Sequence, residues 1–107
     1  MRHVLIIEPH EELAAAMEQV VASADFTPIV RRHVQTMSDI GVVPTTIVVR
    51  IGHGDLSTLP LDRPPVIAIV SSDDEAREAA RLRCEVVLRT PQDIRHLCEV
   101  LRQLSFT

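Results

Sequence analysis

Short aliphatic runs recur along this chain and alternate with segments of helical period. We expect strands at residues 3–7, 27–32, 45–51, 66–71 and 86–88. Continuous apolar runs of this length are typical of strands that lie buried in a parallel sheet. Their alternation with helical segments predicts an α/β fold, in which helices cover the sheet.

Two helices are expected to begin with acidic turns, where the helix dipole favours negative charge. Residues 11–24 have the period of an amphipathic helix. A second helix is expected from Asp73 to about Arg83, with Ser71 or Ser72 as its cap. The side chains expected to face the sheet from the first of these helices are Leu13, Met17, Val20, Val21 and Ala24.

The residues Thr90-Pro91-Gln92-Asp93 predict the start of a last helix that runs to about Leu104. Proline suits the first helical position, and the acid follows the capping threonine by three residues. Earlier in the chain there is little room for helices, with a short one at 36–42 and one turn at 56–61. The buried face of the last helix is expected to comprise Ile94, Leu97, Cys98, Leu101 and Leu104.

The length and composition indicate a single domain, residues 1–107, with one core. The chain is 46% hydrophobic but only 2% aromatic, so the core is expected to be aliphatic. A net charge of -4 gives no basic footprint for nucleic acid, and the scarcity of aromatic rings removes stacking platforms for single strands.

Cysteine usage and hydropathy predict a cytoplasmic protein. Cys84 and Cys98 match no metal or redox spacing, and we expect both to be free thiols. We expect no signal peptide, because the first apolar run is too short and lacks a small-residue cleavage site. No stretch approaches the length that spans a membrane.

Two charged residues stand at the ends of aliphatic runs. Glu8 ends the first run and Arg50 ends the third. The carboxyl ends of the strands in a doubly wound sheet form the crevice where ligands bind. Because these two strands are expected to be neighbours, we expect the carboxylate and the guanidinium to pair within about 6 Å of each other. The alternative is an Arg50 that points into solvent.

Three segments, in their order and spacing, resemble the receiver domain of bacterial two-component response regulators. They are Val4-Leu5-Ile6-Ile7-Glu8-Pro9, Pro65-Val66-Ile67-Ala68-Ile69 with the Asp-Asp-Glu helix start after it, and Val87-Leu88-Arg89-Thr90. The resemblance covers nearly the whole chain. It implies a flavodoxin-like, doubly wound, five-stranded parallel sheet of order 2-1-3-4-5, here with shortened second and third helices.

The resemblance also implies a site, most of which this chain has lost. Receivers accept a phosphoryl group on an aspartate at the end of strand three and hold Mg²⁺ with acids at the end of strand one. Arg50 stands at the phosphoacceptor position, and an arginine cannot form an acyl phosphate. Its guanidinium is expected to take the place of the cation beside Glu8. Pro9 replaces the second acid, Val70 stands at the hydroxyl position with Ser71 next to it, and Val86 stands at the position of the switch aromatic. Arg89 keeps the positive charge of the lysine, and Thr90 replaces the proline that usually follows it.

These losses predict a degenerate receiver, or pseudo-receiver, that works without phosphorylation and is not an enzyme. We expect it to regulate by binding a protein partner, such as a kinase, an output domain or a regulator, or by forming a homodimer. The arginines of the last two helices are either a solvated face of ion pairs or an interaction surface of the kind receivers use to dimerise. They are Arg77, Arg81, Arg95 and Arg102.

Other readings of the sequence remain open at this point. An atypical phosphorelay protein needs another acceptor, such as Asp55 or Asp73. A small enzyme would use Glu8 and a histidine as an acid-base pair. Glu8, His10 and His53 could hold a transition metal, but exposed loop histidines are the preferred interpretation because no ligand spacing is present. We expect no cofactor.

Overall fold

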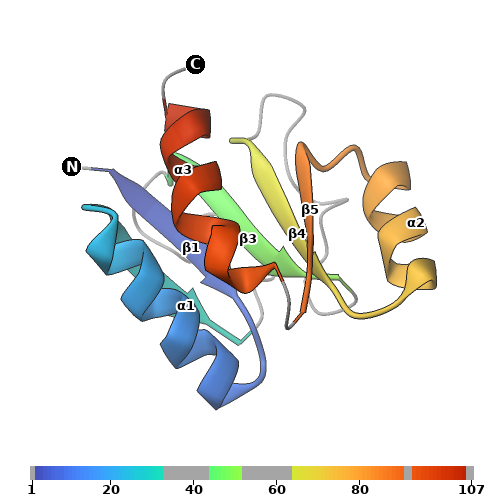
Figure 1. The fold of residues 1–107 in the computed structure, drawn as a ribbon, viewed down its shortest axis with the longest axis horizontal. Coiled ribbons are helices and arrows are strands. Elements are labelled where there is room, and N and C mark those ends of the chain that lie inside the picture. The colour runs from blue at the N-terminus through green and yellow to red at the C-terminus, as the bar shows by residue number, and fades with distance from the viewer. Residues whose placement is uncertain (1, 33–43, 52–63, 91–92, 106–107) are drawn as a thin grey trace.

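The computed structural model describes residues 2–32, 44–51, 64–90 and 93–105. Figure 1 shows the strands of the sheet and the helices beside them. In chain order the elements are β1 (His3–Ile7), α1 (Glu11–Ser23), β2 (Thr27–Arg31), β3 (Thr46–Arg50), β4 (Val66–Val70), α2 (Asp73–Arg81), β5 (Val86–Arg89), the 3-10 helix η3 (Ile94–His96) and α3 (Leu97–Ser105).

All five strands are parallel, and their order is β2-β1-β3-β4-β5. This confirms the predicted order 2-1-3-4-5 of a flavodoxin-like, doubly wound sheet. Strands β1 and β3 are neighbours, with Ile7 opposite Val49. The sites at their carboxyl ends therefore lie beside each other, as a doubly wound sheet requires. Pro28 lies in the edge strand β2, where a missing amide hydrogen is tolerated.

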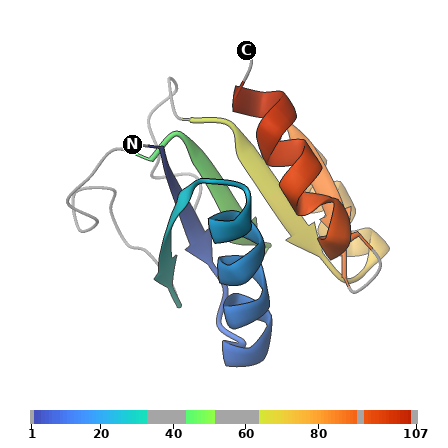
Figure 2. The same cartoon turned by 60° about the vertical axis from the view of Figure 1, so that its left-hand side comes forward.

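Among the α-helices of the described residues, α1 and α3 cover one face of the sheet and α2 covers the other (Figures 1 and 2). Helices α1 and α3 pack together on the face that includes Ile67 and Ile69. Alternate residues of a strand point to opposite faces. Accordingly, Ala68 and Val70 of the same strand contact Ala79 of α2. No helix in the described ranges is long and apolar enough to cross a membrane.

The core is mainly aliphatic, as the composition predicts, although the ring of Phe26 is also buried in it. Every residue of β3 and of β4 is buried, and both strands have a neighbouring strand on each side. The predicted inner face of α1 is largely confirmed. Met17, Val21 and Ala24 are buried, while Leu13 and Val20 are half-buried against the same cluster. Ala14 is also buried, although the prediction omitted it.

Helices α1 and α2 end in the same way without glycine. Asp25 and Arg83 follow the two helices with φ values of 67° and 59°. At the first, the amides of Asp25 and Phe26 donate to the carbonyls of Ala22 and Val21. These paired bonds form a Schellman motif, and α2 ends with the equivalent pair. The left-handed residue turns the chain sharply enough to enter the next strand.

The observed boundaries correct several predicted ones by a few residues. Strands β2, β3 and β4 are shorter than predicted, and β5 extends to Arg89 rather than ending at Leu88. The largest difference is at the last helix, where α3 begins only at Leu97 after η3. There the Asp93 carboxylate accepts a hydrogen bond from the amide of Arg89 at 3.0 Å. In the predicted capping box with Thr90 as the cap, this carboxylate would accept from the amide of Thr90, which is the next residue.

Some predictions fall outside the described residues. These are the short helix at 36–42, the helical turn at 56–61 and the positions of Pro91 and Gln92. The shortened second and third helices therefore stay predictions.

Candidate functional site

The predicted ion pair at the ends of β1 and β3 is confirmed. Nε of Arg50 donates to Oε1 of Glu8 at 2.8 Å and to Oε2 at 2.6 Å. Both residues are buried, Glu8 to 1% exposure and Arg50 to 7%. The alternative in which Arg50 points into solvent is wrong, because the topology places the two strand ends together and the guanidinium is turned toward the carboxylate.

The backbone holds this pair in place. The amide of Glu8 donates to the carbonyl of Arg31 on β2, and Ile51, the residue after Arg50, donates to the carbonyl of Ile69. Within the described ranges, no buried side-chain nitrogen or oxygen lacks a hydrogen-bond partner. A buried ion pair is tolerated when its polar atoms are satisfied in this way, whereas removal of one partner costs about 3–5 kcal/mol.

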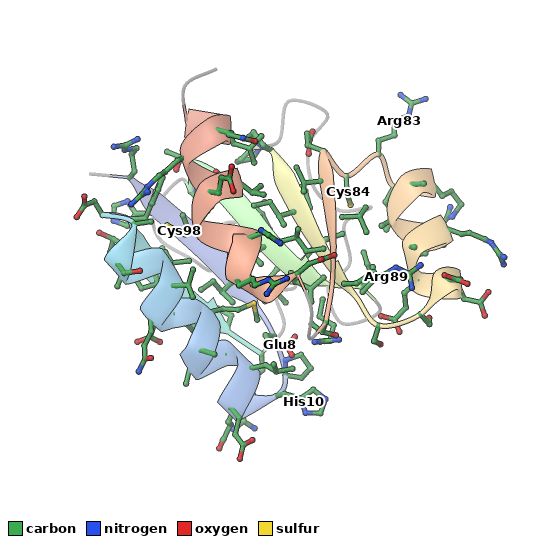
Figure 3. The ribbon with its side chains drawn as sticks, in the orientation of Figure 1. Glu8, His10, Arg83, Cys84, Arg89 and Cys98 are labelled. Carbon is green, nitrogen blue, oxygen red and sulfur yellow. The ribbon has the colours of Figure 1, made fainter. Side chains whose placement is uncertain are left out.

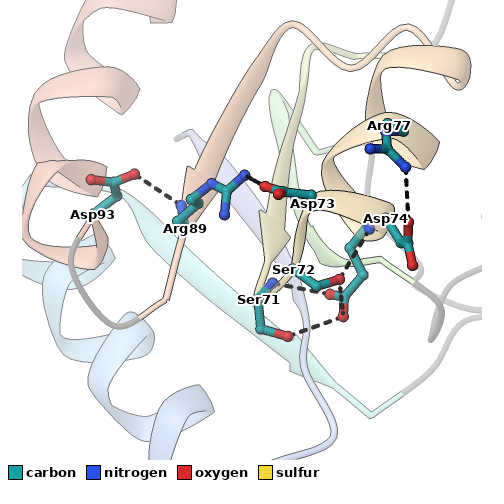
Figure 4. A network of polar contacts seen from close by, with 8 residues as sticks. Ser71, Ser72, Asp73, Asp74, Arg77, Arg89 and Asp93 are labelled. Atoms are coloured by element: carbon teal, nitrogen blue, oxygen red, sulfur yellow. Dashed lines mark hydrogen bonds and ion pairs between the residues drawn. The ribbon is translucent and has the colours of Figure 1, made fainter.

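The end of β4 has no free hydroxyl turned toward the crevice. Val70 is buried in the sheet, as expected for the residue in the hydroxyl position. Ser72 is the cap of α2, and its hydroxyl accepts from the amide of Glu75. Ser71 is occupied as well, because its hydroxyl donates to the Glu75 carboxylate at 3.0 Å (Figure 4). The spacing Ser-x-x-Glu is the sequence signal for the Ser72 cap and was overlooked in the prediction, although the Glu75 carboxylate accepts from the amide of Ser71 rather than from that of Ser72.

Arg89, at the position of the receiver lysine, is also paired. Its guanidinium bonds the carboxylate of Asp73, the first residue of α2. Figure 4 shows Arg89 between Asp73 and Asp93, with its amide bonded to Asp93. Both charged side chains of the Arg89–Asp73 pair are partly exposed, so this pair is screened by solvent. Val86, at the aromatic position, is half-buried against the core.

The arginines predicted as a surface are exposed and fall into two groups. Arg77 pairs with Asp74 at 3.0 Å, and Arg81 pairs with Glu78, each within one turn of α2. The hydrogen bond from Arg81 lowers the pKa of Glu78 below its ordinary value. These two arginines thus form the solvated ion pairs of one interpretation. Arg95 and Arg102 are exposed on η3 and α3.

The residues of the other readings do not assemble into a site among the described residues. His10 is exposed beside the start of α1, and its side chain makes no cap bond (Figure 3). Asp73 is exposed and paired with Arg89, rather than placed at a strand end. His53 and Asp55 lie outside the described residues. In the part of the chain that the structure describes, no three His, Cys, Asp or Glu side chains gather as metal ligands would.

The fold places the chain in the class of flavodoxin-like, doubly wound α/β proteins, with its candidate site at the carboxyl ends of the strands. The sequence matches no protein-family model and no curated protein. Solved structures with a similar fold include response-regulator receiver domains. The signal receiver domain of a DNA-binding response regulator from Colwellia psychrerythraea 34H is 19% identical, with a TM-score of 0.76 and 100% of both chains covered.

A response regulator from Thermotoga maritima has a TM-score of 0.81 at 11% identity, over 100% of this chain and 99% of that one. Full-length FixJ from B. japonicum also has a TM-score of 0.81, at 17% identity, and the match covers 98% of this chain but 58% of FixJ. Identities this low define the fold alone. The chain therefore has the receiver-domain fold that the sequence predicted.

Proposed function

We propose that this chain is a phosphorylation-independent, receiver-like signalling module, a pseudo-receiver in a two-component type of regulatory system. It acts through contact with a protein partner or a second copy of itself. One observation carries the proposal: a buried Arg50–Glu8 ion pair occupies the carboxyl ends of β1 and β3. The likeness to response-regulator receivers supports the signalling role.

The chemistry of the pair supports the loss of phosphoryl transfer. A guanidinium has no nucleophilic oxygen that could accept a phosphoryl group. It also supplies fixed positive charge beside Glu8, so the carboxylate is already neutralised without a divalent cation. Mg²⁺ prefers hard oxygen ligands and keeps several bound waters. A buried guanidinium at hydrogen-bond distance from Glu8 competes with Mg²⁺ for the carboxylate and takes the space of those waters.

The neighbouring groups support a static site. The Ser71 hydroxyl is bonded to Glu75, and the Arg89 guanidinium is bonded to Asp73. Each group that stands at or beside a switching position of a receiver thus has a partner of its own within the chain. We therefore assign regulation to surface contacts. The exposed helix arginines Arg77, Arg81, Arg95 and Arg102 belong to the proposed interface.

The geometry gives no comparable support to the other two functions. An enzyme that used Glu8 as an acid or base would need a free carboxylate oxygen, but both oxygens accept from Arg50. A phosphorelay through Asp73 would need that carboxylate to leave Arg89. We propose no catalytic residue and no cofactor, and we place the module in the cytoplasm.

Incubation with acetyl phosphate and Mg²⁺, followed by intact mass measurement, tests the proposal. We expect no phosphoryl addition to the wild-type chain, while a phosphorylatable receiver treated in parallel gains one. The matched variants Asp73→Asn and Asp55→Asn identify the acceptor if an addition appears. A phosphoryl group that is present in the wild type and absent from one of these variants would overturn the proposal and establish the phosphorelay function.

A further inference from the structure

Strand β2 forms one edge of the sheet, and among the described strands it pairs with β1 alone. Its apolar side chains are half-buried, with Ile29 packed on one face of the sheet and Val30 on the other. An aliphatic edge strand with open backbone groups is a template on which another chain can pair. Whether β2 is such a template depends on the backbone groups that it turns outward.

Two residues of β2 direct their backbone groups away from the sheet. The amide of Thr27 donates to the carbonyl of the residue before β1, and the carbonyl of Arg31 accepts from the amide of Glu8. Successive residues of a parallel strand direct their backbone groups to opposite sides, so Thr27 and Arg31 face β1. Pro28 and Val30 therefore face outward, and an added strand would have to pair with these two residues.

Each outward residue lacks one of the two groups that strand pairing uses. Pro28 has no amide hydrogen, so it cannot donate to a neighbouring strand. Val30 keeps its amide, but its carbonyl accepts a hydrogen bond from Nη1 of Arg31 at 2.8 Å. The Arg31 side chain is exposed, and this bond holds its charged guanidinium against the edge of the strand. One donor is therefore missing from the edge, and one acceptor is already occupied.

We propose that Pro28 and Arg31 close the β2 edge to strand pairing, so that neither a second copy of this chain nor an extended segment of a partner adds to the sheet there. Prolines and charged side chains on an edge strand prevent edge-to-edge association. An added strand would find no donor at Pro28 and would have to displace the Arg31 guanidinium from the carbonyl of Val30. Backbone groups of the added strand would then be buried without partners, which is unfavourable.

The closed edge limits where the module can make contact. This inference rests on the proposed function, in which the module acts by protein contact. It excludes the β2 edge as a contact surface and leaves the exposed faces of the helices for that role. The specificity of the module would then depend on side chains rather than on backbone pairing, which most extended segments can make.

Restoring both backbone groups tests the proposal on the full chain. Pro28→Val returns an amide donor, Arg31→Thr frees the carbonyl of Val30, and both new residues favour strands. In sedimentation velocity, we expect the double variant to associate about tenfold more tightly than the wild type. In hydrogen exchange followed by NMR, the Val30 amide should exchange about tenfold more slowly in the associated variant, because the added strand protects it.

Thr27→Val combined with Arg32→Thr is the matched control. It changes the net charge equally and also adds one valine, but the backbone of Thr27 faces β1 and the Arg32 side chain pairs with Glu11. We expect the control to associate as the wild type does. A control that associates as strongly as the test variant would overturn the proposal, because the lost charge and not the open backbone groups would then cause association.

Arg31→Thr alone decides the question if the double variant does not fold, because it replaces only an exposed side chain. It should associate more tightly than the wild type. Unchanged association of a folded variant would overturn the proposal, and so would a Val30 amide that is already protected in the wild type. None of these results affects the acetyl phosphate test, so failure of this inference and failure of the proposed function are distinguishable.

Discussion

The ion pair at the ends of β1 and β3 and the ion pairs around α2 join the same chemical groups in opposite surroundings. In the first, the side chains of Arg50 and Glu8 are 9% and 0% exposed. In the second, the side chains of Arg77 and Asp74 are 79% and 91% exposed. Water and salt screen the exposed pairs and leave the buried one at nearly full strength. The same chemical groups therefore hold the site at the ends of β1 and β3 in place, whereas on the surface of α2 they contribute little to stability.

Removal of one buried partner should have the largest effect. Arg50→Met leaves the Glu8 carboxylate buried and unpaired, so we expect the free energy of unfolding to fall by about 3–5 kcal/mol. Urea denaturation, followed by circular dichroism, measures the change. A loss below about 1 kcal/mol would show that the pair behaves like a surface pair, and the comparison would fail.

Removal of both buried partners should reverse most of that loss. Glu8→Leu combined with Arg50→Met replaces two charges by apolar groups of similar size, and such replacements are often neutral or stabilising by about 1–4 kcal/mol. We expect the double variant to be at least as stable as the Glu8→Leu and Arg50→Met single variants. If the double variant instead loses the sum of the two single effects, the two residues are not energetically coupled.

The half-exposed pair at the end of β5 should lie between the extremes. Asp73→Ala removes the carboxylate that holds Arg89, and we expect a loss of about 0.2–1 kcal/mol that shrinks at high salt. The same urea experiment at two salt concentrations measures it. Asp74→Ala, on the more exposed pair with Arg77, is the control and should change less. Equal, salt-independent losses would contradict this order.

The smallest effect is a titration. Arg81 lowers the pKa of Glu78 in the folded state through a side-chain hydrogen bond. Its contribution to stability is therefore present above the pKa of the unfolded carboxyl and is lost as the pH falls through the lower folded value. Carbon-detected NMR titration should show the pKa of Glu78 rising in Arg81→Ala. An unchanged pKa would mean that the hydrogen bond does not persist in solution.

The sequence alone determined the fold class and the Glu8–Arg50 ion pair of the candidate site. Strands that are buried on both faces have continuous aliphatic sequences, and these runs predicted the positions of all five strands to within a few residues. The ion pair was predictable as well, because Glu8 and Arg50 end strands that a doubly wound sheet makes neighbours. The two residues are 42 positions apart, and only the topology connects them.

Tertiary structure alone decided which groups the charged side chains bond, because hydrophobic periodicity does not predict those partners. Arg89 could have faced the crevice, yet it bonds Asp73, which lies 16 residues earlier in the chain. Asp93 takes the amide of Arg89 and so displaces the predicted Thr90 cap. The exposure of Val87 likewise follows from where α2 packs, because a valine in an apolar run reads as buried. The hydrophobic pattern of a segment predicts whether that segment is buried. The partner of a charged side chain and the helix that covers an edge strand depend instead on which distant segments the fold brings together.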